Sequence, residues 1–255
     1  MSVASLGMYD HPAQRWANEA LWAAIASHLR AAGIDAPDAL DRRPVEAVWR
    51  DPDLLLAQAC GLPLVADPEL DLTVVAVPSY AVAGCTPGRH LSRIIVHADD
   101  EAANLADLRG MVAAINAPLS NTGANLLRAA FGGIPFSDVK ITGSHRASLA
   151  AVADGAADVA AIDAVTFAAI ARYEPEAVAR VRVLAHTVSV PALPFVTARH
   201  TPPATRAALR KALAAAAHDP ALAEARDALF LADIVSASGQ RYGEVARIAR
   251  ETALA

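Results

Sequence analysis

The stretch VKITGSHRASLAAVADGAADVAAIDAVTFAAIARY, residues 139–173, decides the fold class. A short apolar run leads into a small polar turn and then an amphipathic segment, and the same order follows once more. The preceding stretch has the same form, with VAAIN at 112–116 before TGANLLRAAF at 122–131. Strands that alternate with helices in this way form parallel sheets covered by helices. We therefore predict an α/β protein with mainly parallel sheets flanked by helices.

The same two patterns continue along the rest of the chain. We predict further strands at VASLGM (3–8), LDLTVVAVP (70–78), SRIIVH (92–97), VRVLAHT (181–187) and LPFVTA (193–198). An i, i+4 stripe predicts a helix through Trp16, Ala20, Leu21, Ile25 and Leu29. A second helix is predicted at DPDLLLAQACG (51–61), with Asp51 as its N-cap and Pro52 at its first position. Further helices are predicted at NLADLRG (104–110), after TPP (201–203) and at RYGEVARIARETAL (241–254).

Two segments that contain Pro and Gly, 78–89 and 187–194, are the candidate crossings between two lobes. They predict hinges near 78–92 and 186–194. The first lobe is then discontinuous, with residues 1–82 and 190–255, and the second lobe comprises residues 83–189.

Composition excludes some classes of protein. The net charge of −5 and the lack of a Lys/Arg cluster argue against nucleic acid as a partner. The sequence contains no run of eighteen strongly apolar residues, so we predict no transmembrane helix. MSVASLGMYD lacks the basic and apolar regions of an export signal, so we expect a cytoplasmic protein as written, or a periplasmic one if the natural N-terminus is missing. Cys60 and Cys85 lack metal-site spacing; they are either two buried thiols or a disulfide of an oxidising compartment.

Small polar residues gather where the predicted strands meet the following helices. In open α/β sheets, ligands bind beyond the carboxyl ends of the strands, where helix N-termini also lie. These turns contain Tyr9, Tyr80, Ser120, Asn121, Thr122, Ser144, His145 and Asp163. Each of them has a second reading, since Ser, Thr, Asn and Asp are ordinary helix caps. As a group, hydroxyls and N–H groups at helix starts suit an oxyanion.

Asp163 narrows the kind of anion. A carboxylate beside a fully ionised anion is repelled unless the ligand gives it a proton donor. If Asp163 lines the site, we therefore expect a ligand with a P–OH group or an amine. No catalytic motif, cofactor motif or metal cluster is present to indicate chemistry on that ligand.

The segments PLSNTGANLL (118–127), TGSHRASLAAVADGAADVAAID (142–163) and LPFVTA (193–198) resemble the phosphate/phosphite/phosphonate substrate-binding proteins of ABC transporters. The resemblance implies a type II periplasmic-binding-protein fold, whose two α/β lobes close on the ligand about a hinge. It implies that Ser120, Asn121 and Thr122 hold phosphonate oxygens and that His145 donates another hydrogen bond. Asp163 would face the variable end of the ligand, and Tyr9, Tyr80 and Gln58 would come from the opposite lobe.

From these residues we expect a monomeric solute-binding protein for phosphate, phosphite or an organophosphonate, without enzymatic activity or cofactor. An ABC permease is the candidate protein partner. Two alternatives stay open at this point: a cytosolic enzyme that reuses the fold, similar to the dehydratases of the menaquinone pathway, and a signalling protein that reports its ligand. The lack of an export signal favours the enzyme, and the motif around His145 favours the binding protein.

Overall fold

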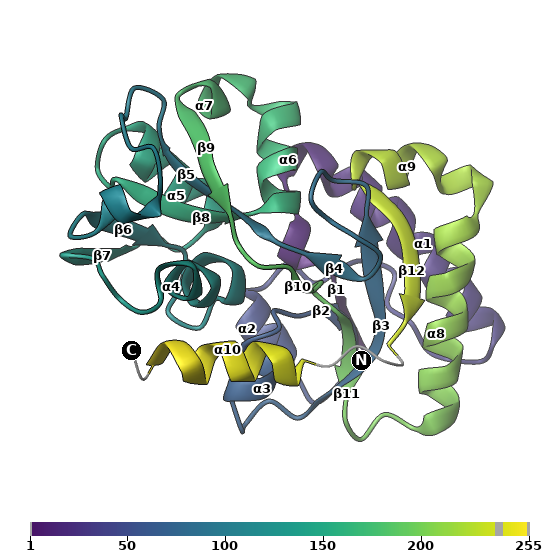
Figure 1. The fold of residues 1–255 in the computed structure, drawn as a ribbon. Coiled ribbons are helices and arrows are strands. Elements are labelled where there is room, and N and C mark those ends of the chain that lie inside the picture. Colours follow the sequence, from purple (N-terminus) through teal and green to yellow (C-terminus); the bar gives the residue numbers. More distant parts are fainter. Residues whose placement is uncertain (1, 238–241, 254–255) are drawn as a thin grey trace. The chain divides into compact units, whose positions relative to one another are not determined.

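The computed structural model describes residues 2–237 and 242–253, and these fall into two compact units (Figure 1). The first unit comprises residues 2–81, 86–89 and 191–237. The second comprises residues 82–85, 90–190 and 242–253. The end of the chain differs from the expected boundary, since residues 242–253 belong to the second unit and not to the first. The two-stranded sheet of β4 (Arg89–His90) and β10 (Val190–Pro191) consists of two segments where the chain passes from one unit to the other.

The sheet of the first unit is mixed. Its strand order is β1 (Val3–Ser5), β2 (Leu54–Gln58), β11 (Phe195–Ala198), β3 (Leu72–Tyr80) and β12 (Leu231–Ser236). β1 and β2 pair in parallel, whereas β11 and β12 join their neighbours antiparallel. The α-helices of this unit are α1 (Arg15–Ala31), α2 (Val45–Trp49), α3 (Pro63–Ala66), α8 (Pro203–His218) and α9 (Ala223–Ala228). Short 3-10 helices are η1 (Gly7–Tyr9), η2 (Pro12–Gln14) and η5 (Pro220–Leu222).

One predicted helix in this unit is wrong. The stretch DPDLLLAQACG forms the strand β2, and all five of its residues, 54–58, are buried. Its capping signals are real but serve a turn, because an Asp51 carboxylate oxygen accepts a hydrogen bond from the Asp53 N–H at 2.9 Å. The stripe of α1 is largely as predicted, with Leu21, Ile25 and Leu29 in the core, although Trp16 is exposed.

The sheet of the second unit is also mixed, in the order β7 (Asp138–Ile141), β6 (Val112–Ile115), β8 (Val159–Asp163), β5 (Ser92–His97) and β9 (Val181–His186). β6 pairs in parallel with β7 and β8, and β5 is antiparallel to both of its neighbours. Both sheets thus contain fewer parallel strand pairs than predicted, because β11 and β12 in the first sheet and β5 in the second run antiparallel to their neighbours. The helices of this unit are η3 (Leu105–Leu108), η4 (Asn121–Asn125), α4 (Leu126–Phe131), α5 (His145–Ala153), α6 (Ala164–Tyr173), α7 (Pro175–Ala179) and α10 (Gly243–Ala253).

Alternate residues of the central strands of this sheet fill two separate cores. Ile95, Ala160 and Ile162 pack in a cluster with apolar residues of α5 and α6. Ile94 and Ala161 belong to a cluster with apolar residues of α4. This is the period-two alternation of a strand that is covered on both faces. Helices therefore cover both faces of the second sheet, and their N-termini follow β6, β7 and β8.

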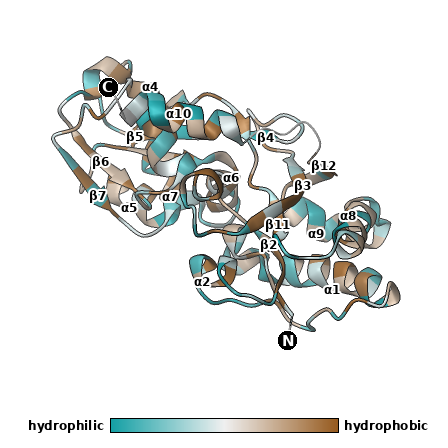
Figure 2. Ribbon diagram, turned by 90° about the horizontal axis from the view of Figure 1, so that it is seen from below, coloured by the Kyte–Doolittle hydropathy of each residue, from teal (hydrophilic) through white to brown (hydrophobic). Residues whose placement is uncertain are grey.

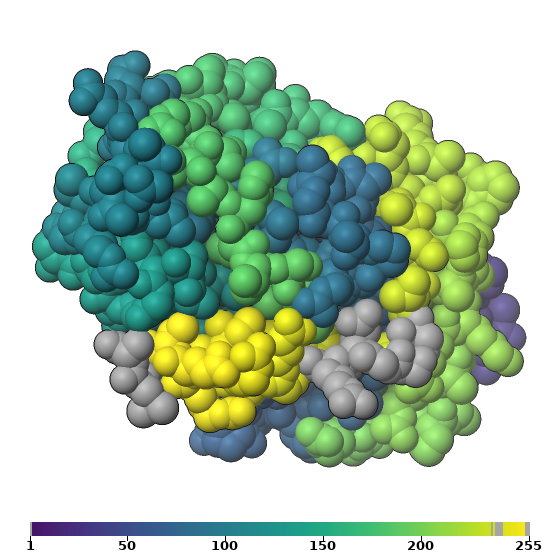
Figure 3. Space-filling view, viewed as in Figure 1, coloured from purple at the N-terminus to yellow at the C-terminus, as the bar shows by residue number. Residues whose placement is uncertain are grey.

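The C-terminal helix α10 contacts α4 and η4 within the second unit. Val245 and Ile248 on its inner face are buried, while its outer face lies on the surface (Figure 3). Residues 241 and 254 of the predicted C-terminal helix lie outside the described residues. Brown strand ribbons such as β3 and β11 mark where hydrophobic residues concentrate inside the first unit (Figure 2). In the described part of the chain, the helices lack the combined length and hydropathy needed to cross a bilayer.

Candidate functional site

The loop after β6 is the centre of the candidate site in the second unit. Ser120 precedes η4, and its hydroxyl oxygen accepts a hydrogen bond from the Gly123 N–H at 3.0 Å. η4 is one turn of π-helix, a wide turn that is often found at functional sites. Ser120, Asn121 and Thr122 are all buried. The sequence SNTG therefore caps a helix, the alternative role given to these residues in the sequence analysis. Its side chains also form a compact group of hydroxyl and amide groups.

Gly123 is needed here because neighbouring side chains approach it closely. A Cβ atom at this position would lie 1.9 Å from Asn116 Oδ1 and 3.1 Å from His145 Cε1. Asn116, the residue directly after β6, was not among the predicted site residues, and its Oδ1 is buried without a hydrogen-bond partner among the described residues. The position of Asn116 at a strand end, beside a polar turn, was the signal that could have identified it.

The turn after β7 joins this loop through His145. Ser144 caps α5, since its hydroxyl oxygen accepts a hydrogen bond from the Ala147 N–H at 3.1 Å. His145 Nε2 lies 2.9 Å from the hydroxyl oxygen of Thr122. Burial lowers the pKa of His145, although attraction to Asp163 opposes the shift. The imidazole is therefore neutral at pH 7, and its tautomer decides whether Nε2 donates to or accepts from the Thr122 hydroxyl.

Asp163 ends β8 and caps α6. Its Oδ1 accepts hydrogen bonds from the N–H groups of Val165 at 2.9 Å and Thr166 at 3.2 Å. Its Oδ2 lies 3.0 Å from Nδ1 of His90, which is fully buried. Burial opposes ionisation of Asp163, but attraction to His90 and the hydrogen bonds that the carboxylate accepts outweigh it, so the pKa of Asp163 is lowered.

His90 changes the argument about the ligand. The sequence analysis looked for a proton donor to Asp163 on the ligand, whereas the structure places a ring nitrogen of His90 3.0 Å from the carboxylate. Sequence reasoning missed His90 because it lies in a two-residue strand, 73 positions before its partner, with no local motif. Ser92 was missed in the same way; it is fully buried, and its hydroxyl donates a hydrogen bond to the Thr122 carbonyl at 2.9 Å.

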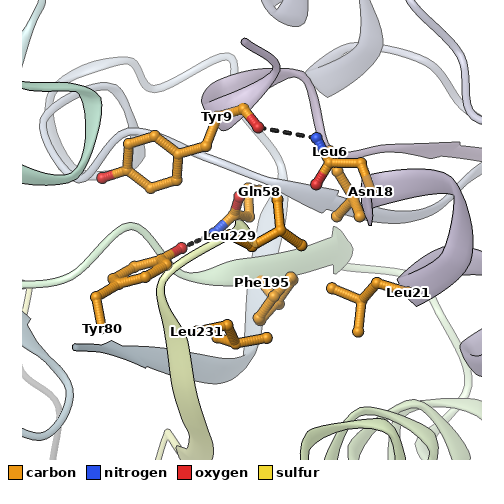
Figure 4. Close-up of a pocket in the computed structure, with 9 residues that line it drawn as sticks. All are labelled: Leu6, Tyr9, Asn18, Leu21, Gln58, Tyr80, Phe195, Leu229 and Leu231. Carbon is orange, nitrogen blue, oxygen red and sulfur yellow. Dashed lines mark hydrogen bonds between the residues drawn. The ribbon is translucent and has the colours of Figure 1, made fainter. Parts of the chain in front are cut away.

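The remaining predicted residues form a separate group in the first unit (Figure 4). The rings of Tyr9 and Tyr80 meet edge to face, with their centroids 5.4 Å apart. Gln58 Nε2 donates a hydrogen bond to the Tyr80 hydroxyl at 2.9 Å. These three side chains are part of the lining of a cavity of about 20 Å³, enough for about one water molecule. Its lining is mainly apolar: Leu6, Tyr9, Asn18, Leu21, Gln58, Tyr80, Phe195, Leu229 and Leu231.

The two cysteines do not form the disulfide that the sequence left open, because both are thiols in the structure. Cys60 belongs to the first unit and Cys85 to the second. Burial raises the pKa of the Cys85 thiol to about 11, and the negative charge of Asp163 adds to the shift. Within the described ranges, no three His, Cys, Asp or Glu side chains are grouped as they would be around a metal ion.

A family model described as the phosphonate periplasmic substrate-binding protein of ABC transporters matches residues 53–242. A comparison with curated protein sequences finds no match. Among solved structures, the chain is similar to PhnD1 from Prochlorococcus marinus in complex with methylphosphonate, with a TM-score of 0.74 and 16% identity over 98% of this chain and 97% of that chain.

Two other solved structures are similar over most of their length. XAC2383 from Xanthomonas citri, bound to chloride ion, has a TM-score of 0.75 and 19% identity over 98% of this chain and 97% of that chain. A binding protein component of an ABC phosphonate transporter from Pseudomonas aeruginosa has a TM-score of 0.71 and 14% identity, over 92% and 80% of the two chains. The fold is therefore that of the two-lobed periplasmic binding proteins.

Proposed function

Since the chain belongs to the family of phosphonate periplasmic substrate-binding proteins of ABC transporters, we propose that it binds a small phosphorus oxyanion: phosphate, phosphite or an organophosphonate. It holds this ligand for delivery and performs no chemistry on it. The observation that carries the proposal is the Thr122–His145 contact of 2.9 Å, which joins the polar turns after two neighbouring parallel strands. The expected ligand residues of the second unit are Ser120, Asn121, Thr122, Ser144, His145 and Asp163.

This arrangement suits a tetrahedral anion. Backbone N–H groups at a helix start carry partial positive charge, and hydroxyl groups rotate to meet oxygens in different directions. Gly123 keeps the turn free of a side chain that would fill the space near Asn116 and His145. Relatives of the same fold support anion binding, since solved structures hold methylphosphonate in the Prochlorococcus protein and chloride or ATP in the Xanthomonas protein.

We propose Tyr9, Tyr80 and Gln58 of the first unit as a second group of ligand residues. Their edge-to-face ring contact and the Gln58–Tyr80 hydrogen bond hold the three side chains in fixed positions. The family description also supports the periplasm as the compartment and an ABC permease as the partner. Fractionation of cells that express the natural gene would test the compartment.

A thermal-shift screen followed by isothermal titration calorimetry tests the binding function. Phosphate, phosphite, methylphosphonate, sulfate and acetate are compared at equal concentration. A ligand at 100 times its Kd raises the free energy of unfolding by about 2.7 kcal/mol, so at least one phosphorus compound should raise Tm clearly. If no phosphorus compound raises Tm or gives binding heat, the proposed function is wrong.

Hydroxyl variants then locate the site. We expect Ser120→Ala and Thr122→Val to weaken binding of the preferred oxyanion, because each removes a hydroxyl from the loop after β6. Ser137→Ala is the matched control, since Ser137 is an exposed residue of the same unit whose hydroxyl bonds only weakly to the Met111 carbonyl at 3.3 Å. Equal affinity of all four proteins would place the ligand elsewhere.

A further inference from the structure

We propose that Ser92 is a positioning residue for the oxyanion: its hydroxyl holds the peptide group after Thr122, and this peptide group directs the Ser120 hydroxyl towards the ligand. The inference rests on the proposed function and adds to it a residue that acts without touching the ligand. Ser92 is the first residue of β5 and is fully buried. Ser92, Ser120 and Thr122 all belong to the second unit.

The peptide group that joins Thr122 to Gly123 is held at both of its ends. Its carbonyl oxygen accepts a hydrogen bond from the Ser92 hydroxyl at 2.9 Å. Its N–H group donates a hydrogen bond to the Ser120 hydroxyl oxygen at 3.0 Å. Since a peptide group is planar, a restraint on the carbonyl also sets the direction of the N–H group. Ser92 therefore acts on Ser120 through one rigid unit.

Gly123 is the reason that this peptide group needs a restraint from outside the turn. Glycine has no Cβ, so its backbone rotates more freely than that of other residues. A larger residue does not fit, because a Cβ at this position would lie 1.9 Å from Asn116 Oδ1. The peptide group also lies in η4, a single turn of π-helix, which is a rare conformation. The side chain of Ser92 supplies the restraint that glycine lacks.

The backbone of Ser92 is itself fixed by the strands beside it. Its N–H donates a hydrogen bond to the Thr187 hydroxyl oxygen at 2.9 Å, and its carbonyl accepts one from the Thr187 N–H at 3.0 Å. On the other side, β5 pairs with β8, and Ser92 stands opposite Asp163 in the register. A side chain whose backbone is locked in this way can hold another group in a defined position.

The Ser120 hydroxyl takes its direction from the Gly123 N–H. A hydroxyl group has one proton to donate and two lone pairs that accept. One lone pair of Ser120 accepts the Gly123 N–H, and its proton has no acceptor among the described residues. The proton is therefore available to an oxygen of the ligand. Rotation of the peptide group would turn the Thr122 carbonyl towards Ser120, and this carbonyl would then take the proton in place of the ligand.

A double-mutant cycle measured by isothermal titration calorimetry tests the inference. The probe is whichever of phosphate, phosphite and methylphosphonate the wild-type protein binds most tightly. Ser120→Ala should weaken binding about tenfold or more, because it removes a hydrogen bond to an anion. Ser92→Ala should weaken binding about five- to tenfold, although the Ser120 hydroxyl is still present. In the Ser120→Ala background, Ser92→Ala should change the affinity less than about twofold, because the hydroxyl on which it acts is gone.

The matched control is Ser148→Ala. Ser148 is another fully buried serine of the second unit, and its hydroxyl is hydrogen-bonded to the Thr142 hydroxyl at 2.7 Å. This variant also loses a buried hydrogen bond, yet it should bind the oxyanion within about twofold of the wild type.

Two results of the calorimetry would overturn the inference. One is a Ser92→Ala protein that binds within about twofold of the wild type, and the other is an equal loss from Ser92→Ala in both backgrounds. Failure of the wild type to bind any of the three compounds is a different result, which overturns the proposed function.

Nuclear magnetic resonance of the wild-type protein tests the inference without a variant, should Ser92→Ala fail to fold. Hydrogen bonds in a chain polarise one another, so an anion that accepts the Ser120 proton should alter the groups behind it. At ligand saturation we expect the amide signals of both Gly123 and Ser92 to shift. A Ser92 signal that stays unchanged while the Gly123 signal shifts would contradict a connection through the peptide group.

Discussion

Gly123→Ala should destabilise the second unit, although alanine is normally the better helix residue. The separation between the new Cβ and Asn116 Oδ1 has to grow from 1.9 Å to the 3.4 Å at which ordinary contact begins, and His145 Cε1 limits movement on the other side at 3.1 Å. Overpacking of this kind costs about 1–3 kcal/mol. Alanine recovers about 0.5–1 kcal/mol of backbone entropy. We therefore expect a net loss of about 1–2 kcal/mol in the free energy of unfolding.

A double-mutant cycle with Asn116→Ala tests the cause of this loss. Urea unfolding followed by far-UV circular dichroism gives the free energy for the wild type, both single variants and the double variant. Because Asn116→Ala removes the clashing oxygen, Gly123→Ala should be neutral or stabilising in that background, and the coupling energy should exceed about 1 kcal/mol. Gly243→Ala is the control, since a Cβ there meets nothing within 4 Å. A Gly123→Ala protein as stable as the wild type, or an equal loss in both backgrounds, would refute the reasoning.

Three further predictions follow from single contacts. Thr122→Val removes the hydroxyl group that lies 2.9 Å from His145 Nε2. The loss of a hydrogen bond of about 0.5–1.5 kcal/mol should weaken the affinity for the preferred oxyanion about 2- to 12-fold in calorimetry. Unchanged affinity would show that Thr122 is not part of the site. Burial lowers the pKa of folded His145, so the unfolded chain binds a proton first as the pH falls below about 6.5, and stability should drop by at most about 1.4 kcal/mol per pH unit. His145→Gln should flatten this slope in urea unfolding between pH 7.5 and 5.0, and an equal slope in both proteins would contradict the assignment. Tyr80→Phe removes the hydroxyl oxygen that accepts a hydrogen bond from Gln58 Nε2 at 2.9 Å and leaves this amide only the Leu193 carbonyl, at 3.5 Å. The loss should lower the free energy of unfolding by about 1–3 kcal/mol, measured by the fluorescence of the three tryptophans, which all lie in the first unit. An unchanged midpoint would mean that the Leu193 carbonyl is a sufficient partner for the amide.

The repeated units between 112 and 173 could be predicted from the sequence because each unit is local. Ser144 and Asp163 cap the helices that directly follow them, so their positions at strand ends were readable from neighbouring residues. Helix and strand are harder to tell apart in a short apolar run that is buried on all sides. The helix predicted at 51–61 was wrong for this reason, because its central residues form the fully buried strand β2.

Pairings over long separations in the chain could not be predicted in the same way. His90 meets Asp163 only because β5 pairs antiparallel with β8, with Ser92 opposite Asp163 in the register. Nothing near position 90 in the sequence indicates this contact. The sequence analysis looked for the partner of Asp163 on a ligand, whereas the fold brings His90 of the same chain beside its carboxylate.

The packing of α10 on η4 and α4 has a consequence for how the protein is made. The chain leaves the ribosome from its N-terminus, so the loop that contains Ser120 and Thr122 emerges more than a hundred residues before the helix that backs it. Until residues 243–253 emerge, α4 and η4 lack the contacts that they make with α10 in the folded unit. Residues 243–253 therefore complete the packing around the loop only after the loop itself has emerged, and a truncation that removes them alters a part of the molecule that contacts η4 directly.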